Sequence, residues 1–192
     1  MYVVLAGLDN AQRPNLILIH NSQVKVRQIS DFDVQRVRFV EEVGRTTGRA
    51  SSQNAVPPAF LTVGKESIRI WRAKDTFDRD AVISGHSLFL GEHARENTFT
   101  DFTVVERGQK ALVVSSLGCL YIVDVLKKEV IGVFQIHEEP CRTIESITVR
   151  VPGDGVVAEG TQQLVITGDT QGRVKVWPID FSESLMEAKL DS

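Results

Sequence analysis

The stretch that decides the fold is residues 164–177, which read LVITGDTQGRVKVW. An apolar run leads to Gly168, a short polar turn follows, and from Arg173 polar and apolar residues alternate as far as Trp177. Alternation with a period of two is typical of a strand with one buried face, and the glycine-containing turn is typical of a hairpin. The stretch therefore predicts two antiparallel strands joined by a tight turn.

The same pattern occurs elsewhere in the chain. Residues 60–71 read FLTVGKESIRIW and residues 112–124 read LVVSSLGCLYIVD, and a fainter copy lies within residues 3–20. Trp71, Val123 and Trp177 follow one another at intervals of 52 and 54 residues, near the period of about 40 to 50 residues typical of four-stranded propeller blades. The repeats therefore predict an all-β propeller.

Other short apolar runs, each bounded by Gly, Asn, Asp or Ser, also predict strands. The expected strands are residues 2–7, 16–20, 24–28, 34–41, 59–63, 67–73, 88–91, 99–106, 111–115, 120–125, 130–137, 144–151, 163–167 and 173–178. Residues 182–191 fit either a short helix or a last strand. We expect a partial propeller of about four four-stranded blades at residues 1–30, 34–92, 99–137 and 144–191, the first without its innermost strand.

Length and composition exclude several classes of protein. The chain has 192 residues, 42% of them hydrophobic and 24% charged, which suits one globular domain. Its net charge of −3 argues against a nucleic-acid partner, and no apolar run approaches the roughly 18 residues of a membrane span. Two cysteines provide no disulfide framework; we expect Cys119 to be buried and Cys141 to lie on an exposed connection. No cofactor is expected.

These repeats resemble the WD-repeat β-propeller family, whose blades are each fixed by a buried network of His, Ser or Thr, Asp and Trp. The resemblance assigns structural repeat positions to Trp71, Trp177, Thr167, Ser115, Asp124 and either His93 or His137. Lys65, Leu117 and Gln171 stand where the family has its turn aspartate, and Val123 replaces one tryptophan. We therefore expect no complete tetrad in any blade and a greater reliance on apolar packing.

Two further segments resemble the proteome-of-centriole family, large WD-repeat proteins of centrioles and cilia. They are GEH (91–93) followed by FTDF (99–102), and WPIDFS (177–182), within a resemblance that covers residues 59–190. It implies a non-catalytic structural component of centrioles, basal bodies or axonemes in the cytoskeleton. The implied partners are tubulin in microtubules, or centriole and axoneme scaffold proteins. A WD-repeat adaptor in a trafficking or signalling complex is the alternative.

The number of blades leads to a further expectation. Closed propellers of this family have about seven or eight blades, and an open arc would expose sheet faces that are normally buried. We therefore expect either a piece of a longer protein or a homodimer that completes the ring. A dimer mass in light scattering would favour ring completion.

Two polar features are candidates for function. The loop 44–58 contains Arg45 and Arg49 and no acidic residue, so it is a possible partner-binding arm for an acidic protein surface. His93 and Glu96 form a His-x-x-Glu sequence that also occurs in zinc peptidases, but a catalytic zinc needs a third protein ligand. We therefore expect no catalytic residue and no metal site, and keep zinc-dependent peptidase activity as a remote alternative.

Overall fold

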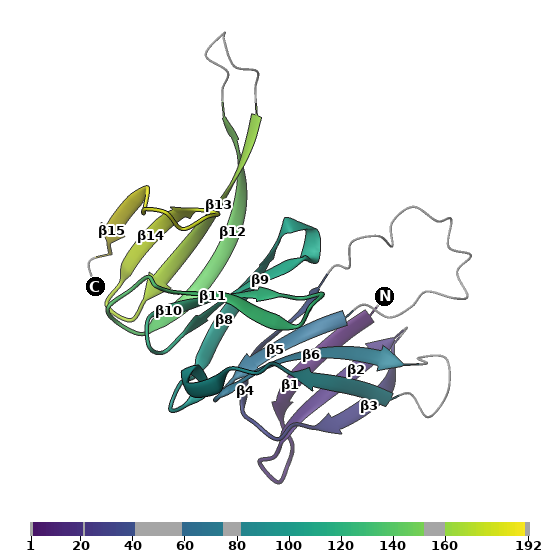
Figure 1. Ribbon diagram of the computed structural model, residues 1–192. Helices are drawn as coiled ribbons and strands as arrows, with labels where there is room; N and C mark the ends of the chain where they lie inside the picture. The colour runs from purple at the N-terminus through teal and green to yellow at the C-terminus, as the bar shows by residue number, and fades with distance from the viewer. Residues whose placement is uncertain (1, 21, 41–58, 75–81, 152–159, 191–192) are drawn as a thin grey trace.

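The protein is built from β-sheets stacked side by side in chain order. The computed structural model describes residues 2–20, 22–40, 59–74, 82–151 and 160–190. These residues form fifteen strands in four antiparallel sheets and two short 3₁₀ turns, η1 (Gly91–Ala94) and η2 (Glu106–Gly108) (Figure 1). Within the described ranges no helix is long and apolar enough to cross a membrane. The all-β prediction is confirmed.

The first sheet has three strands among the described residues, and the other three have four each. The first contains β1 (Tyr2–Leu8), β2 (Pro14–His20) and β3 (Gln23–Ile29). The second contains β4 (Val34–Val40), β5 (Ala59–Gly64), β6 (Ser67–Lys74) and β7 (Val82–Ser87). The third contains β8 (Phe99–Val105), β9 (Lys110–Ser115), β10 (Cys119–Asp124) and β11 (Glu129–Gln135). The fourth contains β12 (Cys141–Val151), β13 (Gly160–Asp169), β14 (Arg173–Pro178) and β15 (Met186–Lys189).

Two boundaries differ from the sequence predictions. Residues 88–91 are not a strand, because Leu90 has a helical backbone conformation and Gly91 a positive φ of 54°, which end the extended chain. Leu88 and Leu90 are nevertheless buried, which explains why the run looked like a strand. The fourth strand of that sheet is β7 instead. The ambiguous segment 182–191 contains a strand, β15, and no helix.

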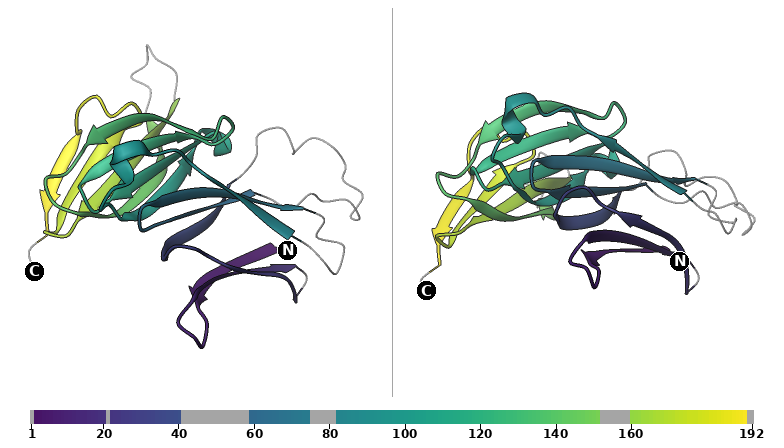
Figure 2. Two further views of the ribbon diagram at one scale, coloured as in Figure 1. Left: turned by 60° about the horizontal axis from the view of Figure 1, so that its bottom comes forward. Right: turned by 90° about the horizontal axis from the view of Figure 1, so that it is seen from below.

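Apolar side chains fill the space between neighbouring sheets. Figure 2 shows the sheets following one another from the N-terminal to the C-terminal end of the chain. Between the first two sheets, Phe60 stacks on Trp71 with ring centroids 6.0 Å apart. Between the second and third, Phe99 meets the edge of Tyr121 at 5.1 Å, and between the third and fourth Trp177 packs against buried strand residues. Each sheet therefore stabilises the next by burying one apolar face.

The innermost strands β4, β8 and β12 are joined by one buried carboxylate. Asp101 on β8 is 1% exposed and accepts a hydrogen bond from Arg36 Nε on β4 at 2.8 Å. On its other side it accepts bonds from Thr143 Oγ1 at 3.2 Å and from the backbone N–H of Ile144 at 3.3 Å, both on β12. Asp101 thus connects three consecutive blades.

Candidate protein-interaction face

The fourth sheet holds a complete buried hydrogen-bond chain. Trp177 Nε1 donates to Thr167 Oγ1 at 2.9 Å, and Thr167 Oγ1 lies 2.8 Å from His137 Nε2. His137 Nδ1 lies 3.2 Å from Asp169 Oδ2, and both of these side chains are fully buried. The expectation that no blade has a complete tetrad is therefore wrong, because the turn aspartate is Asp169 and not the residue at Gln171.

Electrostatics determine how protons are shared in this tetrad. Burial lowers the pKa of His137, and the neighbouring carboxylate of Asp169 only partly opposes that effect. Burial opposes ionisation of Asp169, but hydrogen bonds from the backbone N–H groups of Arg173 and Gln171 and the nearby imidazole lower its pKa overall. We assign a neutral His137 whose Nδ1–H donates to Asp169, so that Nε2 accepts the Thr167 hydroxyl proton. Every donor in this four-residue hydrogen-bond network then has an acceptor.

The second and third sheets hold reduced versions of the tetrad. In the second, Trp71 Nε1 donates to Thr62 Oγ1 at 2.8 Å, and Gly64 stands at the position of Asp169. In the third, the hairpin register aligns Ser115 with Asp169 and Val113 with Thr167, so Ser115 lies at the turn position and not at the hydroxyl position of the middle strand. Only the fourth sheet, among those described, combines all four side-chain types.

A different polar cluster lies beside the third sheet, where the β7–β8 connection meets the β9–β10 turn. Asn97 is fully buried, and its Nδ2 donates to the carbonyl of His93 at 3.0 Å and to the Tyr121 hydroxyl at 3.1 Å. Ser116 Oγ donates to Asn97 Oδ1 at 3.3 Å. This cluster fixes the connection between β7 and β8 to the β9–β10 turn without a tetrad histidine. At the other end of β10, Asp124 Oδ1 accepts the backbone N–H groups of Leu126 and Lys127 and caps that turn.

The two cysteines lie in different surroundings from those expected. Cys141 is buried in β12 and not on an exposed connection, and burial raises the pKa of its thiol to about 12. Cys119 is half-buried, with its Sγ 3.1 Å from Gln135 Oε1. A thiol that stays protonated is a poor nucleophile, so Cys141 acts as a small apolar side chain.

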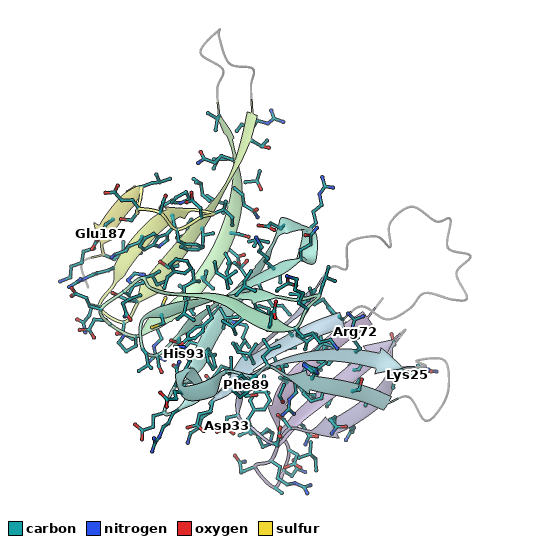
Figure 3. The ribbon with its side chains drawn as sticks, in the orientation of Figure 1. Lys25, Asp33, Arg72, Phe89, His93 and Glu187 are labelled. Carbon is teal, nitrogen blue, oxygen red and sulfur yellow. The ribbon has the colours of Figure 1, made fainter. Side chains whose placement is uncertain are left out.

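The β7–β8 connection presents an exposed aromatic residue on a fixed backbone. Phe89 is 91% exposed, whereas Leu88 and Leu90 on either side are buried (Figure 3). His93 is exposed on the following turn η1, where its ring meets the edge of Tyr121 at 6.1 Å. Leu117, 51% exposed, lies in the β9–β10 turn, which hydrogen-bonds to the same connection. We name these three residues, Phe89, His93 and Leu117, the rim patch.

The other predicted positions carry less information. Arg45 and Arg49 lie outside the described residues. Glu96 follows η1, and no three His, Cys, Asp or Glu side chains within the described ranges are grouped so that they could hold a metal ion. Trp71 and Trp177 are 2% and 8% exposed, so both are core residues and not ligand platforms.

Comparisons with known proteins agree with this geometry. No protein-family model matches the chain. The WD40 β-propeller domain of Doa1 superposes with a TM-score of 0.63 at 15% identity, covering 100% of this chain and 51% of that one. The C-terminal WD40 domain of Sif2 superposes at 0.49 with 14% identity, covering 70% of this chain and 34% of that one. The Doa1 superposition shows that the fold is that of a WD40 β-propeller, present here in part.

One curated sequence is similar as well. Centriole proteome protein 16 of Chlamydomonas reinhardtii is 27% identical over 147 residues, a match that covers 68% of this chain and 6% of that protein. The chain thus spans a small fraction of the relative that it matches and about half of the solved Doa1 propeller.

Proposed function

We propose that this WD40 propeller segment is a non-catalytic scaffold that acts through protein–protein contacts in a centriole. The observation that carries the proposal is the similarity to Centriole proteome protein 16, which covers 68% of the chain and includes propeller sequence. The WD40 fold supports a scaffold or adaptor role in general, because rigid stacked blades present fixed surfaces to partners. Tubulin in microtubules, or other scaffold proteins of centrioles and axonemes, are the proposed partners.

The rim patch supports the contact mechanism. Buried anchors dominate the affinity of protein interfaces, and large aromatic residues are frequent among them. Phe89 is positioned by buried neighbours on both sides, so little conformational entropy is lost when a partner covers its ring. An exposed aromatic side chain held in this way is better suited to binding than to stability.

The proposal assigns no catalysis to the chain. His93 and Glu96 belong to an exposed turn, and the buried His137 is saturated by Thr167 and Asp169. A general base must reach a substrate, and His137 is 2% exposed.

Sedimentation with stabilised microtubules tests the tubulin part of the proposal. The full chain and an Arg45→Ala/Arg49→Ala variant are mixed with microtubules across a salt series, with Arg13→Ala/Arg27→Ala as the matched control outside the loop. We expect the chain to pellet at low salt, to be released as salt rises, and to pellet less when the loop arginines are removed. Folded chain that stays in the supernatant at every salt concentration would contradict a tubulin contact and favour the adaptor alternative.

Phe89→Ala tests the rim patch with centriolar scaffold proteins as bait. We expect about a tenfold or greater loss of affinity, because interface anchors commonly contribute 2 kcal/mol or more. Phe134→Ala, a change of the same size at a residue 39% exposed on β11, is the control and should bind as the wild type does. Equal loss in both variants would mean a general effect on folding and would argue against the rim patch.

A further inference from the structure

The first sheet differs from the other three at its inner edge. The second, third and fourth sheets each place an innermost strand, β4, β8 or β12, beside β5, β9 or β13. β1 contacts β4 in the way that β5 contacts β8 and β9 contacts β12. β1 therefore occupies the second position of its blade, and in the described part of the chain no strand pairs with its other edge.

That edge of β1 is accessible. Residues 5–8 of the strand are exposed, and Leu5 and Leu8 are 48% and 61% exposed. Unpaired N–H and C=O groups along a strand edge are a template for another extended segment. The neighbouring blades also show which side chains such a segment would need.

The first requirement is electrostatic. Arg36, Asp101 and Thr143 occupy the same position on the three inner strands, next to a bulge in each pairing. Arg36 and Thr143 both donate hydrogen bonds to Asp101, so each of the three residues contacts a neighbouring inner strand. In a strand added beside β1, the residue equivalent to Arg36, Asp101 and Thr143 would lie next to Arg36. The Arg36 side chain is 47% exposed, so a carboxylate there would share a guanidinium that Asp101 only partly covers.

The second requirement is apolar. Val40 follows Arg36 by four residues and is buried between the second and third sheets, and Val105 follows Asp101 by four and is buried between the third and fourth. The corresponding residue of an added strand would face the cluster of Leu16, Leu18, Phe60 and Trp71 between the first two sheets. A four-residue interval between the acidic and the apolar residue is thus set by the register already present.

We propose that the free edge of β1 binds an extended polypeptide segment from outside these 192 residues as the fourth, innermost strand of the first blade. The segment carries an acidic residue beside Arg36 and an apolar residue four positions later, the pattern that β8 has at Asp101 and Val105. Strand addition of this kind gives affinity through the backbone and specificity through the two side chains. This binding site depends only on β1 and the inner strands, wherever in the cell the protein acts.

A synthetic peptide with the sequence of residues 98–106 is the probe, because it contains both required side chains at the right interval. The peptide is titrated into the full chain while amide hydrogen exchange is followed residue by residue. We expect exchange in β1 to slow by about tenfold or more at saturation, because its edge amides become hydrogen-bonded. The same peptide with Asp101→Lys should bind at least about tenfold more weakly, since it places a cation beside Arg36.

Variants of the protein complete the test. Arg36→Gln should weaken binding of the unmodified peptide and remove the difference in affinity between the two peptides. Arg13→Gln in the β1–β2 turn should change neither affinity. The peptide arm alone decides the matter if Arg36→Gln fails to fold. Unchanged exchange in β1, or equal affinity of the two peptides for the wild-type chain, would overturn the proposal. Protection of β1 that rises with protein concentration in the absence of peptide, and that persists in Met186→Glu, would also overturn it, because a second copy would then occupy the strand edge.

Discussion

Thr167 is the central residue of the hydrogen-bond chain in the fourth sheet. Its hydroxyl accepts the Trp177 indole N–H and donates to His137, so it holds both ends of the tetrad together. Because all of these groups are buried, their hydrogen bonds cannot be replaced by water without opening the blade. The single hydroxyl therefore has more effect on stability than its size indicates.

Thr167→Val tests this role. The change keeps the shape of the side chain but leaves the Trp177 N–H and the His137 Nε2 without partners, and each unpaired buried group costs about 1 to 3 kcal/mol. We expect the free energy of unfolding to fall by about 2 to 4 kcal/mol in chemical denaturation. Thr62→Val, which removes the hydrogen-bond acceptor of the Trp71 indole, should cost about half as much. A loss no larger than that of exposed Thr148→Val would contradict the assigned tetrad.

His137 should make the stability of the chain depend on pH. Its pKa is lowered in the folded protein, so the unfolded chain takes up a proton there first as the pH falls. The contribution is fully present above the unfolded value of about 6.5 and is lost as the pH falls from there through the lower folded pKa. The slope for one such proton has a limit of about 1.4 kcal/mol per pH unit.

Denaturation of the wild type and two variants between pH 7.5 and 5.5 measures this contribution. His137→Gln should flatten the dependence in that interval, whereas His93→Gln, at an exposed position, should leave it unchanged. Identical slopes in the wild type and His137→Gln would show that His137 is not held neutral by its surroundings.

At the scale of the strands, the inner strands form a second stabilising system, centred on Asp101. We expect Asp101→Ala to lower the free energy of unfolding by about 3 kcal/mol or more, because it leaves Arg36, the Thr143 hydroxyl and the buried N–H of Ile144 without their acceptor. Asp31→Ala is the matched control, since it also removes an arginine partner, that of Arg69, but at a side chain that is 69% exposed. That exposed pair should contribute less than about 1 kcal/mol. Equal losses would mean that Asp101 does not link the blades.

The strands were largely predictable from sequence, whereas the polar contacts between them were not. Period-two alternation of residue type revealed β6 and β14. It did not predict which side chains are buried, because Ile70 and Trp71, on opposite faces of β6, are both buried and only Trp177 is buried in β14. Asp169 was missed because the hairpin turns differ in length: Gly64 pairs with Ser67, but Gly168 pairs with Val174, so a fixed offset from the tryptophan points to the wrong residue. Counting forward from the threonine would have found it.

Other features depend on long-range packing. Asp101 lies 65 residues from Arg36 and 42 from Thr143, and no local pattern in the sequence brings these residues together. Phe89 lies in an apolar run that resembles a strand, and its exposure follows only from the turn at Leu90 and Gly91. Sequence repeats therefore predicted the blades, and the structure was needed to find the contacts between them.

At the scale of the whole molecule, the stack of blades leaves two apolar sheet faces open. On the fourth sheet Met186 is 54% exposed and pairs with Val176, on the face opposite to Trp177. On the first sheet, Leu5 and Ile29 are 48% and 52% exposed and help to line a hollow of about 720 Å³. Faces of this kind are covered by the next blade in a closed propeller.

Light scattering on the purified chain tests whether these faces pair. We expect a dimer mass at micromolar concentrations, because a second copy can place its first sheet against the fourth sheet of the other and so bury both apolar faces. Met186→Glu should shift the mass toward the monomer, and Leu126→Glu, at the β10–β11 turn, should not. A monodisperse monomer at every concentration would contradict pairing between copies and mean that other blades cover these faces.

The location of the protein in cells tests the central claim most directly. The protein is tagged at its own gene in a cell that builds centrioles, and its position is compared by expansion microscopy with a tubulin stain of the centriole wall. A scaffold of the kind proposed here should coincide with the wall or lumen of every centriole and remain there after soluble protein is extracted. A signal that is spread through the cytoplasm or sits on membranes, and is lost on extraction, would contradict the account.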